Sequence, residues 1–285
     1  MQFILLSIAC SVSVGILLKL LRSGKSQVSQ IVAWNYFFAL LLCYFLFKPE
    51  LSAIDGSAPW PVYISLGFLL PGIFLALAAS IKYMGIVKTD AAQRMSLCIP
   101  LLAAWLLFNE NFGIQKIIGL AIGIPALVMI LWKKSDRAGN NWIYPAIVLV
   151  GFGAIDILFK QVALYSAVTY TTSLFVVFVI SLLVAFGIAG AEVLTRKTTF
   201  NFSNLPLGLI LGALNFGNIF FYLRAHKAFS DNPSTVFAMM NIGVIVLGSL
   251  VGVMAFKEKL SWLNYVGLAL AIVSITTIAF VHIGS

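Results

Sequence analysis

Residues 105–119 read WLLFNENFGIQKIIG, and residues 254–267 read MAFKEKLSWLNYVG. In both segments an apolar run leads to a Phe-x-Glu triplet, and a glycine follows nine residues after the glutamate. The two segments lie 148 residues apart, about half the length of the 285-residue chain. This spacing indicates that the second half of the chain repeats the first.

Further matches keep the same order along the chain. Pro61, Gly67, Gly72 and Lys82 recur 145 residues later as Pro206, Gly212, Gly217 and Lys227, and the run Ile16 to Lys19 recurs 141 residues later as Ile157 to Lys160. Because the offset drifts by only a few residues, we interpret these matches as one duplication. It predicts a first copy at residues 1–137 and a second copy at residues 138–285.

The composition is typical of a membrane protein. Apolar residues make up 61% of the chain and charged residues 9%, against about 45–50% and 25% in a soluble domain. A bilayer-spanning helix needs about 20 apolar residues, and ten such runs leave no room for a separate soluble domain. We expect helices at residues 2–21, 29–47, 61–83, 89–108, 112–132, 142–163, 168–190, 205–227, 234–255 and 262–282. The predicted fold class is an all-α polytopic membrane protein with ten transmembrane helices.

Each copy holds five of these helices. Because five is an odd number, the second copy enters the membrane from the opposite side, and the two copies form inverted repeats. Many secondary transporters are built in this way, since exchanging the roles of the copies gives an inward-open and an outward-open packing. The segment from Thr89 to Glu110 is four residues shorter than that from Pro233 to Glu258. We therefore expect the fourth helix to be shorter or kinked by about one turn.

The closing elements of the two copies, Trp105 to Gly119 and Met254 to Gly267, resemble the drug/metabolite transporter superfamily, specifically its EamA-type members. The five-plus-five helix count extends this resemblance to the whole chain. The resemblance implies that helices 1, 3, 4, 6, 8 and 9 surround a central cavity, whereas helices 5 and 10 pack outside. It also implies transport of amino acids or related metabolites, often as export, across the inner membrane of the cell.

Charged residues inside the predicted helices are the first candidates for a site, because an ionised side chain at a helix centre costs about 2.5–3.5 kcal/mol to insert. Asp156 lies in the sixth helix, where the first copy has Gly15. We interpret Asp156 as a solute-binding residue that also couples transport to protons. Alternatively, Asp156 pairs with Lys160 four residues later, which is the favourable order on a helix.

Three basic residues are further candidates for the solute site. Arg94 lies inside the fourth helix, and its guanidinium suits a carboxylate or phosphate. Alternatively, it pairs with Asp90. Lys19 and Lys160 occupy equivalent positions in the two copies, and either residue can instead extend from a helix end to the lipid headgroups.

Asn215, Asn218 and Tyr222 share one face of the eighth helix because they are spaced by three and four residues. Asn241 adds an amide in the ninth helix. Such polar side chains face the protein interior, where they line a wet cavity or bond a neighbouring helix. We expect these four residues to line the solute site near mid-membrane.

The chain has no sign of catalysis, a cofactor or a metal. His226 and His282 are its only histidines, both predicted near helix ends at the membrane interface, and no HExxH, GxSxG or Walker motif occurs. Cys10, Cys43 and Cys98 form no disulfide or metal pattern. The net charge of +9 is scattered through short loops, which is typical of membrane anchoring and not of nucleic-acid binding.

Several features are predicted to be structural. Glu110 and Glu258 each end a helix just before the next one, where a carboxylate stabilises a helix N-terminus. The spacings Gly119-x-x-x-Gly123 and Gly248-x-x-x-Gly252 are typical of close helix contacts.

The sequence therefore predicts a secondary or facilitative transporter of a small polar metabolite that works by alternating access, with the lipid bilayer and the solute as its partners. The alternatives are a non-transporting membrane scaffold, a channel, or an exchanger of sugar phosphates or nucleotide sugars. Loops after odd-numbered helices carry twelve Lys and Arg residues, and the opposite side carries five. The positive-inside rule then places both termini outside the cytoplasm, although bacterial relatives usually have both termini inside.

Overall fold

The computed structural model describes residues 1–21, 27–54, 56, 58–84, 86–131, 141–165, 167–196, 199–257 and 261–280, and this part of the chain is all-helical. The α-helices are α1 (Gln2–Leu21), α2 (Val28–Phe47), α3 (Trp60–Met84), α4 (Ile86–Met95), α5 (Cys98–Leu106), α6 (Ile114–Leu131), α7 (Ile143–Leu164), α8 (Tyr170–Arg196), α9 (Leu205–Ala228), α10 (Pro233–Phe256) and α11 (Trp262–Phe280), with 3-10 turns η1 (Leu51–Ala53) and η2 (Phe202–Asn204). By length and composition, six helices are long and apolar enough to cross a membrane, and four shorter apolar segments complete the set. These ten segments are the ten predicted helices.

The fourth predicted helix is broken into α4 and α5. Pro100 explains the position of the break, because a proline ring clashes with the carbonyl four residues earlier, here that of Ser96. The Ser96 hydroxyl donates to the Gln93 carbonyl (2.6 Å) and so satisfies an acceptor that the end of α4 leaves free. The fourth helix, predicted to be shorter or kinked, thus contains a two-residue turn at Ser96 and Leu97.

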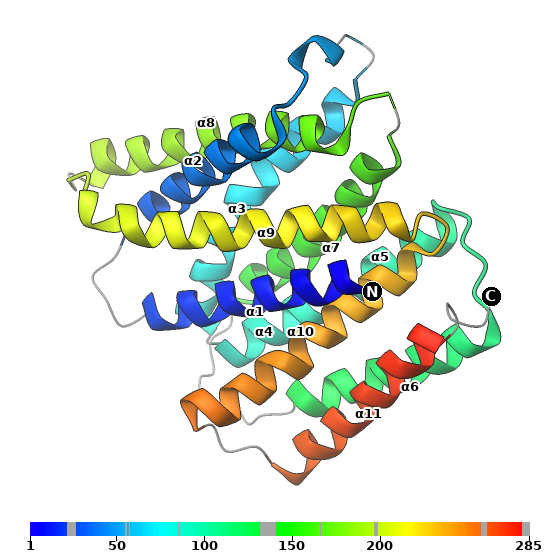
Figure 1. Ribbon diagram of the computed structural model, residues 1–285. Coiled ribbons are helices and arrows are strands. Elements are labelled where there is room, and N and C mark those ends of the chain that lie inside the picture. Colours follow the sequence, from blue (N-terminus) through cyan, green and yellow to red (C-terminus); the bar gives the residue numbers. More distant parts are fainter. Residues whose placement is uncertain are drawn as a thin grey trace.

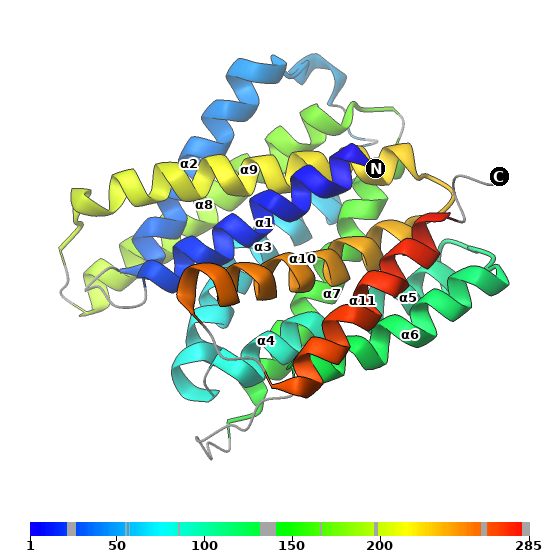
Figure 2. The same cartoon turned by 60° about the horizontal axis from the view of Figure 1, so that its bottom comes forward.

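Two helix pairs flank the bundle. α2 lies beside α8, and α6 lies beside α11, with α1, α3, α7, α9, α10 and the broken α4–α5 between the two pairs (Figures 1 and 2). This arrangement places the fifth and tenth membrane segments outside the central six, as the resemblance implies. Figure 1 also shows that α1 begins and α11 ends at the same end of the bundle, which we call the termini end.

Contacts between the two halves of the chain are reciprocal. Gly119 on α6 lies against Ile278 on α11, and Gly267 on α11 lies against Ile130 on α6. Both pairs of positions are related by the same offset of 148 residues. Likewise, α1 packs on α9 as α7 packs on α3. Two inverted copies would produce such contacts, and the boundary between residues 137 and 138 stays a prediction.

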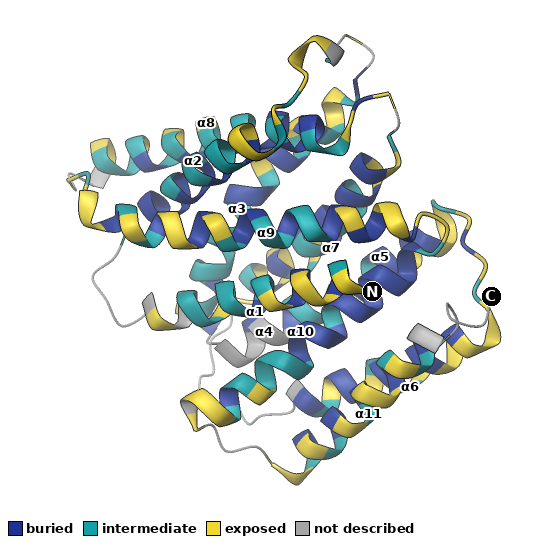
Figure 3. Ribbon diagram, in the orientation of Figure 1, coloured by how far each residue is buried: buried dark blue, intermediate teal, exposed yellow. Residues whose placement is uncertain are grey.

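The outer surface of the bundle is apolar. Large side chains such as Phe45, Leu183 and Met254 are 70%, 68% and 81% exposed, and Figure 3 shows that exposed positions lie on the outer faces of the helices. Exposed apolar surface on this scale marks a membrane-embedded protein. Lipid tails therefore cover these side chains.

Candidate solute-binding site

Asp156 on α7 accepts a hydrogen bond from α9 of the second half. The Tyr222 hydroxyl on α9 donates to Oδ1 of Asp156 (2.7 Å). The Asn241 side chain on α10 lies near this carboxyl group, and its amide nitrogen donates to the carbonyl oxygen of Phe237 (3.0 Å). Tyr222 is only 5% exposed. Three polar side chains from three helices thus meet inside an apolar bundle. We call these residues the Asp156 group.

Lys160 does not pair with Asp156. Its side chain is fully buried, and Nζ donates to the carbonyl oxygen of Ser230 (2.6 Å) in the loop after α9. Its charge also interacts with Glu110 and Asp231. Both alternatives predicted for Lys160, a pair with Asp156 and an anchor among the headgroups, are therefore wrong, because protein encloses the amine.

The break between α4 and α5 lies beside the Asp156 group. Ile99, in the first turn of α5, packs against Gly153 of α7, where an added Cβ would lie 2.7 Å from the Ile99 side chain. Gly153 precedes Asp156 by about one helical turn. Arg94 is half-buried in the last turn of α4 and is not among the bonding partners of Asp156. Interrupted helices of this kind bind solute in many secondary transporters.

The remaining polar side chains of α9 contact other helices. The Ser7 hydroxyl on α1 donates to Oδ1 of Asn218 (2.8 Å). Asn218 therefore bonds a neighbouring helix, which was the predicted alternative to lining a cavity. Asn215 is 5% exposed and lies beside the Tyr36 hydroxyl on α2. The polar face of α9 is therefore turned inward, but it spreads over several neighbouring helices.

A polar pocket of about 660 Å³ lies at the termini end of the bundle. It is lined by Leu107, Phe108, Asn109, Glu110, Asn111, Lys160, Leu164, Ser230, Asp231 and Asn232. We call it the Lys160 pocket. Lys160 follows Asp156 by about one turn of α7, so the pocket lies next to the Asp156 group.

Glu110 in the wall of this pocket caps α10. Its Oε2 accepts from the backbone N–H of Ser234 (2.9 Å), and its Oε1 accepts from the Ser234 hydroxyl (2.6 Å). Lys116 forms an ion pair with Glu110 and donates to Oδ1 of Asn232 (2.9 Å). The sequence predicted that Glu110 stabilises the N-terminus of the helix that follows it, which is α6. The helix that Glu110 stabilises is instead α10, in the second half of the chain. Glu258 lies outside the described residues.

His226, predicted at the membrane interface, is fully buried. Its ring contacts Tyr222 edge-on at a centroid distance of 4.6 Å, and the Phe237 ring lies 4.8 Å away on α10. The prediction was wrong because distance from a helix end does not reveal which segments cover that end. The sequence did contain a sign that His226 faces inward. It follows Tyr222 by four residues and so extends the polar face of α9 by one turn.

Comparison with known proteins identifies the family. The model of the EamA-like transporter family matches residues 1–132, and an uncharacterized protein of Haemophilus influenzae is 37% identical over 285 residues, covering 96% of both chains. The chain belongs to the EamA-like transporter family. A crystal structure that is 16% identical, with a TM-score of 0.72 over 98% of this chain and 97% of the other, shares the fold.

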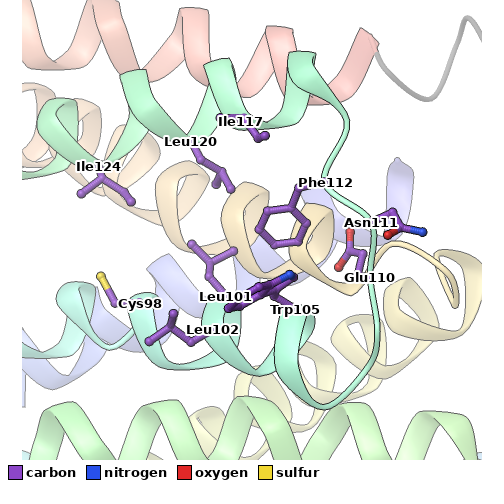
Figure 4. Close-up of a pocket in the computed structure, with 10 residues that line it drawn as sticks. All are labelled: Cys98, Leu101, Leu102, Trp105, Glu110, Asn111, Phe112, Ile117, Leu120 and Ile124. Carbon is purple, nitrogen blue, oxygen red and sulfur yellow. The ribbon is translucent and has the colours of Figure 1, made fainter.

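A second pocket of this EamA-like transporter, about 630 Å³ in volume, lies between α5 and α6. Figure 4 shows Glu110 and Asn111 at one end of a lining that is otherwise apolar. Leu102 and Trp105 in this lining are 58% and 60% exposed on the outer face of the bundle. The second pocket therefore suits hydrocarbon chains and not a polar solute.

The predicted site residues of the EamA-like transporter thus fall into separate places. Asp156, Tyr222 and Asn241 lie together in the Asp156 group. Lys160 lies in the adjacent pocket, and Arg94 lies at the helix break. Asn215 contacts α2, and Asn218 contacts α1. The side chains of Lys19 and Asp90 lie outside the described residues. Within the described residues, no group of three or more His, Cys, Asp or Glu side chains is placed to hold a metal ion.

Proposed function

We propose that this EamA-like transporter moves a small polar metabolite by alternating access, with the Asp156 group contacting the solute. The convergence of Asp156, Tyr222 and Asn241 carries this proposal. Polar and charged groups are costly inside a membrane and are retained where they act. A scaffold would disperse such groups into separate helix contacts, as the bond between Ser7 and Asn218 does.

The chemistry of the group favours an amino acid or a related zwitterion as the solute. A carboxylate, a hydroxyl and an amide suit an ammonium group, because together they offer several acceptors. Arg94 at the nearby helix break suits a carboxylate. Sugar phosphates and nucleotide sugars carry more negative charge, and the neighbouring Lys160 is already engaged by Ser230. We therefore favour the zwitterion over the phosphate exchanger.

We also assign proton coupling to Asp156 and place the protein in the inner membrane of the cell. Tyr222 and Asn241 are neutral partners, so among the described residues no bonded cation holds Asp156 in its charged form. A carboxylate in these surroundings is able to gain and lose a proton during transport. The multi-pass helical fold of an EamA-like transporter suits the inner membrane.

Thermal unfolding of the purified protein across a panel of amino acids and related metabolites tests the proposal. A solute present at about 100 times its Kd should stabilise the folded state by about 2.7 kcal/mol, and the same solute should enter proteoliposomes. Tyr222→Phe removes the hydroxyl that bonds Asp156 and should weaken the stabilisation. Tyr265→Phe makes the same change on the exposed face of α11 and should not. A Tyr222→Phe variant that binds like the wild type would overturn the assignment of the site.

A further inference from the structure

His226 is a buried polar side chain that solute binding does not use. Its side chain is 0% exposed, and neither Nδ1 nor Nε2 has a hydrogen-bond partner among the described residues. Buried polar groups are almost always bonded to protein or water, and leaving one unsatisfied costs about 1–3 kcal/mol. A neutral imidazole offers one donor and one acceptor. The two nitrogens are therefore left to bond a group other than the described residues, and water is the simplest such group.

The position of His226 links the Lys160 pocket to the Asp156 group. The ring contacts Tyr222 at 4.6 Å, and the Tyr222 hydroxyl donates to Asp156. Ser230, four residues after His226, lines the pocket, and its carbonyl oxygen accepts from Nζ of Lys160 (2.6 Å). Polar groups thus run in order from the Lys160 pocket through His226 and Tyr222 to Asp156.

The charges around the ring are few. α7 presents Asp156 and Lys160, whereas α10 presents the uncharged Phe237 at 4.8 Å. The neighbouring cations of α9 are directed elsewhere, since Arg224 and Lys227 each lie over an aromatic ring outside this group. Among the described titratable side chains of α9, Tyr222 and His226 are therefore the two that face the path.

We propose that His226 relays protons between the Lys160 pocket and Asp156. A hydrated proton in the pocket binds one ring nitrogen, and the ring releases the proton of its other nitrogen toward Tyr222. The Tyr222 hydroxyl passes its own proton to Oδ1 of Asp156 and accepts the released one. One proton moves and no electrons are transferred. The ring is left as its other tautomer and returns to the first by exchanging protons with water. Histidine suits this role because the neutral ring accepts a hydrogen bond at one nitrogen and donates one from the other.

The relay rests on the proposed coupling through Asp156, so the test includes both residues. Wild type, His226→Phe, His226→Gln and Asp156→Asn are reconstituted with a pH dye inside the vesicles, and solute-driven proton uptake is timed. Phenylalanine keeps the ring contacts without the nitrogens, and glutamine keeps hydrogen bonding without binding a proton. Both His226 variants should slow proton uptake by about 100-fold, and Lys227→Met, which changes a charge one residue away, should not.

The other possible results would overturn the relay, and they distinguish its failure from a failure of proton coupling through Asp156. Wild-type proton uptake in both His226 variants, with none in Asp156→Asn, would overturn the relay and leave coupling through Asp156 intact. Full recovery in His226→Gln alone would show that the ring only donates or accepts a hydrogen bond. Solute transport by the wild type without proton movement would overturn the coupling and the relay together. Melting temperatures are measured first, and His226→Gln decides the test if His226→Phe does not fold.

Discussion

Asp156 accepts a hydrogen bond from α9, whereas Lys160 four residues later is bonded to the loop after α9. The favourable spacing on one helix predicted a pair between them, but tertiary partners compete with a neighbour one turn away. Tyr222 and Asn241 are both neutral. The neutral partners of Asp156 are the basis for the proposed change of its charge during transport.

Asp156→Asn should uncouple transport from protons. The substitution keeps the shape of the side chain but removes its change of charge. Solute accumulation driven by a pH gradient should therefore disappear. Solute exchange between the two sides should stay detectable, with a weakened affinity for the solute. Accumulation and counterflow in proteoliposomes measure the two activities, with Glu50→Gln at an exposed position as the matched control. Wild-type transport that ignores a pH gradient would leave a facilitator or an exchanger.

Asn218→Leu should affect the fold more than the solute site. Sequence spacing predicted this side chain for the cavity, but its Oδ1 accepts from Ser7 of α1. Losing one interhelical bond in a membrane costs about 0.6 kcal/mol, so the melting temperature should fall slightly. Solute-induced stabilisation should be kept, and Ser7→Ala should behave in the same way. Loss of solute binding in Asn218→Leu but not in Ser7→Ala would return Asn218 to the site.

At the scale of elements, apolar runs predicted the ten membrane segments because a helix must satisfy its own backbone inside lipid. The offset between the copies predicted a defect in the fourth helix, and Pro100 fixed its place at Ser96. What covers a helix end was not predictable, because it depends on segments far away in sequence. Hence Glu110 was assigned to the wrong helix, and His226 was placed at the interface.

Alanine substitution should have opposite effects on stability at two glycines, Gly267 and Gly248. An added Cβ at Gly267 would lie 2.8 Å from the backbone oxygen of Ala126, whereas nothing described lies within 4 Å of one at Gly248. The prediction that Gly248 belongs to a contact face is therefore wrong. Gly267→Ala should force α6 and α11 apart and cost about 1–3 kcal/mol. Gly248→Ala should keep or raise stability, since alanine favours helices by up to about 1 kcal/mol over glycine.

Unfolding of the two variants in the same detergent measures this difference directly. Equal stability would show that the α6–α11 contact yields more readily than its backbone distance implies.

The capping of α10 by Glu110 gives a second prediction at this scale. Glu110→Gln leaves the buried Lys116 without its anionic partner, and breaking a buried pair from one side costs about 3–5 kcal/mol. Adding Lys116→Met should recover much of that loss, because no buried charge then stays unpaired. Chemical unfolding of the two single variants and the double variant tests this coupling. Additive losses would contradict it.

At the scale of the whole molecule, polar bonds join the two halves at both ends of the bundle. Glu110 and Lys116 bind Ser234 and Asn232 at the termini end. At the opposite end, Oε1 of Gln30 accepts from the backbone N–H of Asn201 (2.9 Å) and from the amide of Asn204. Alternating access requires that these two sets of bonds open in turn. The reciprocal helix contacts provide the symmetry for such an exchange.

The orientation of the bundle decides which side supplies the proton. The loops opposite the termini end carry twelve Lys and Arg residues, against five at the termini end. The positive-inside rule therefore predicts that the opposite end lies in the cytoplasm. With this predicted orientation, the Lys160 pocket opens outside the cell. Protons entering there through His226 would move inward, which is the direction that drives export of a solute.

Cysteine labelling tests this orientation. In a variant with Cys10, Cys43 and Cys98 replaced by alanine, Ser52→Cys at the termini end should react in intact cells with a maleimide that cannot cross membranes. Ser135→Cys, in the positively charged segment between the two copies, should react only after the cells are opened. The charge asymmetry underlies this expectation, because basic loops resist translocation. The reverse pattern would place both termini in the cytoplasm. The Lys160 pocket would then release protons to the cytoplasm rather than receive them from outside.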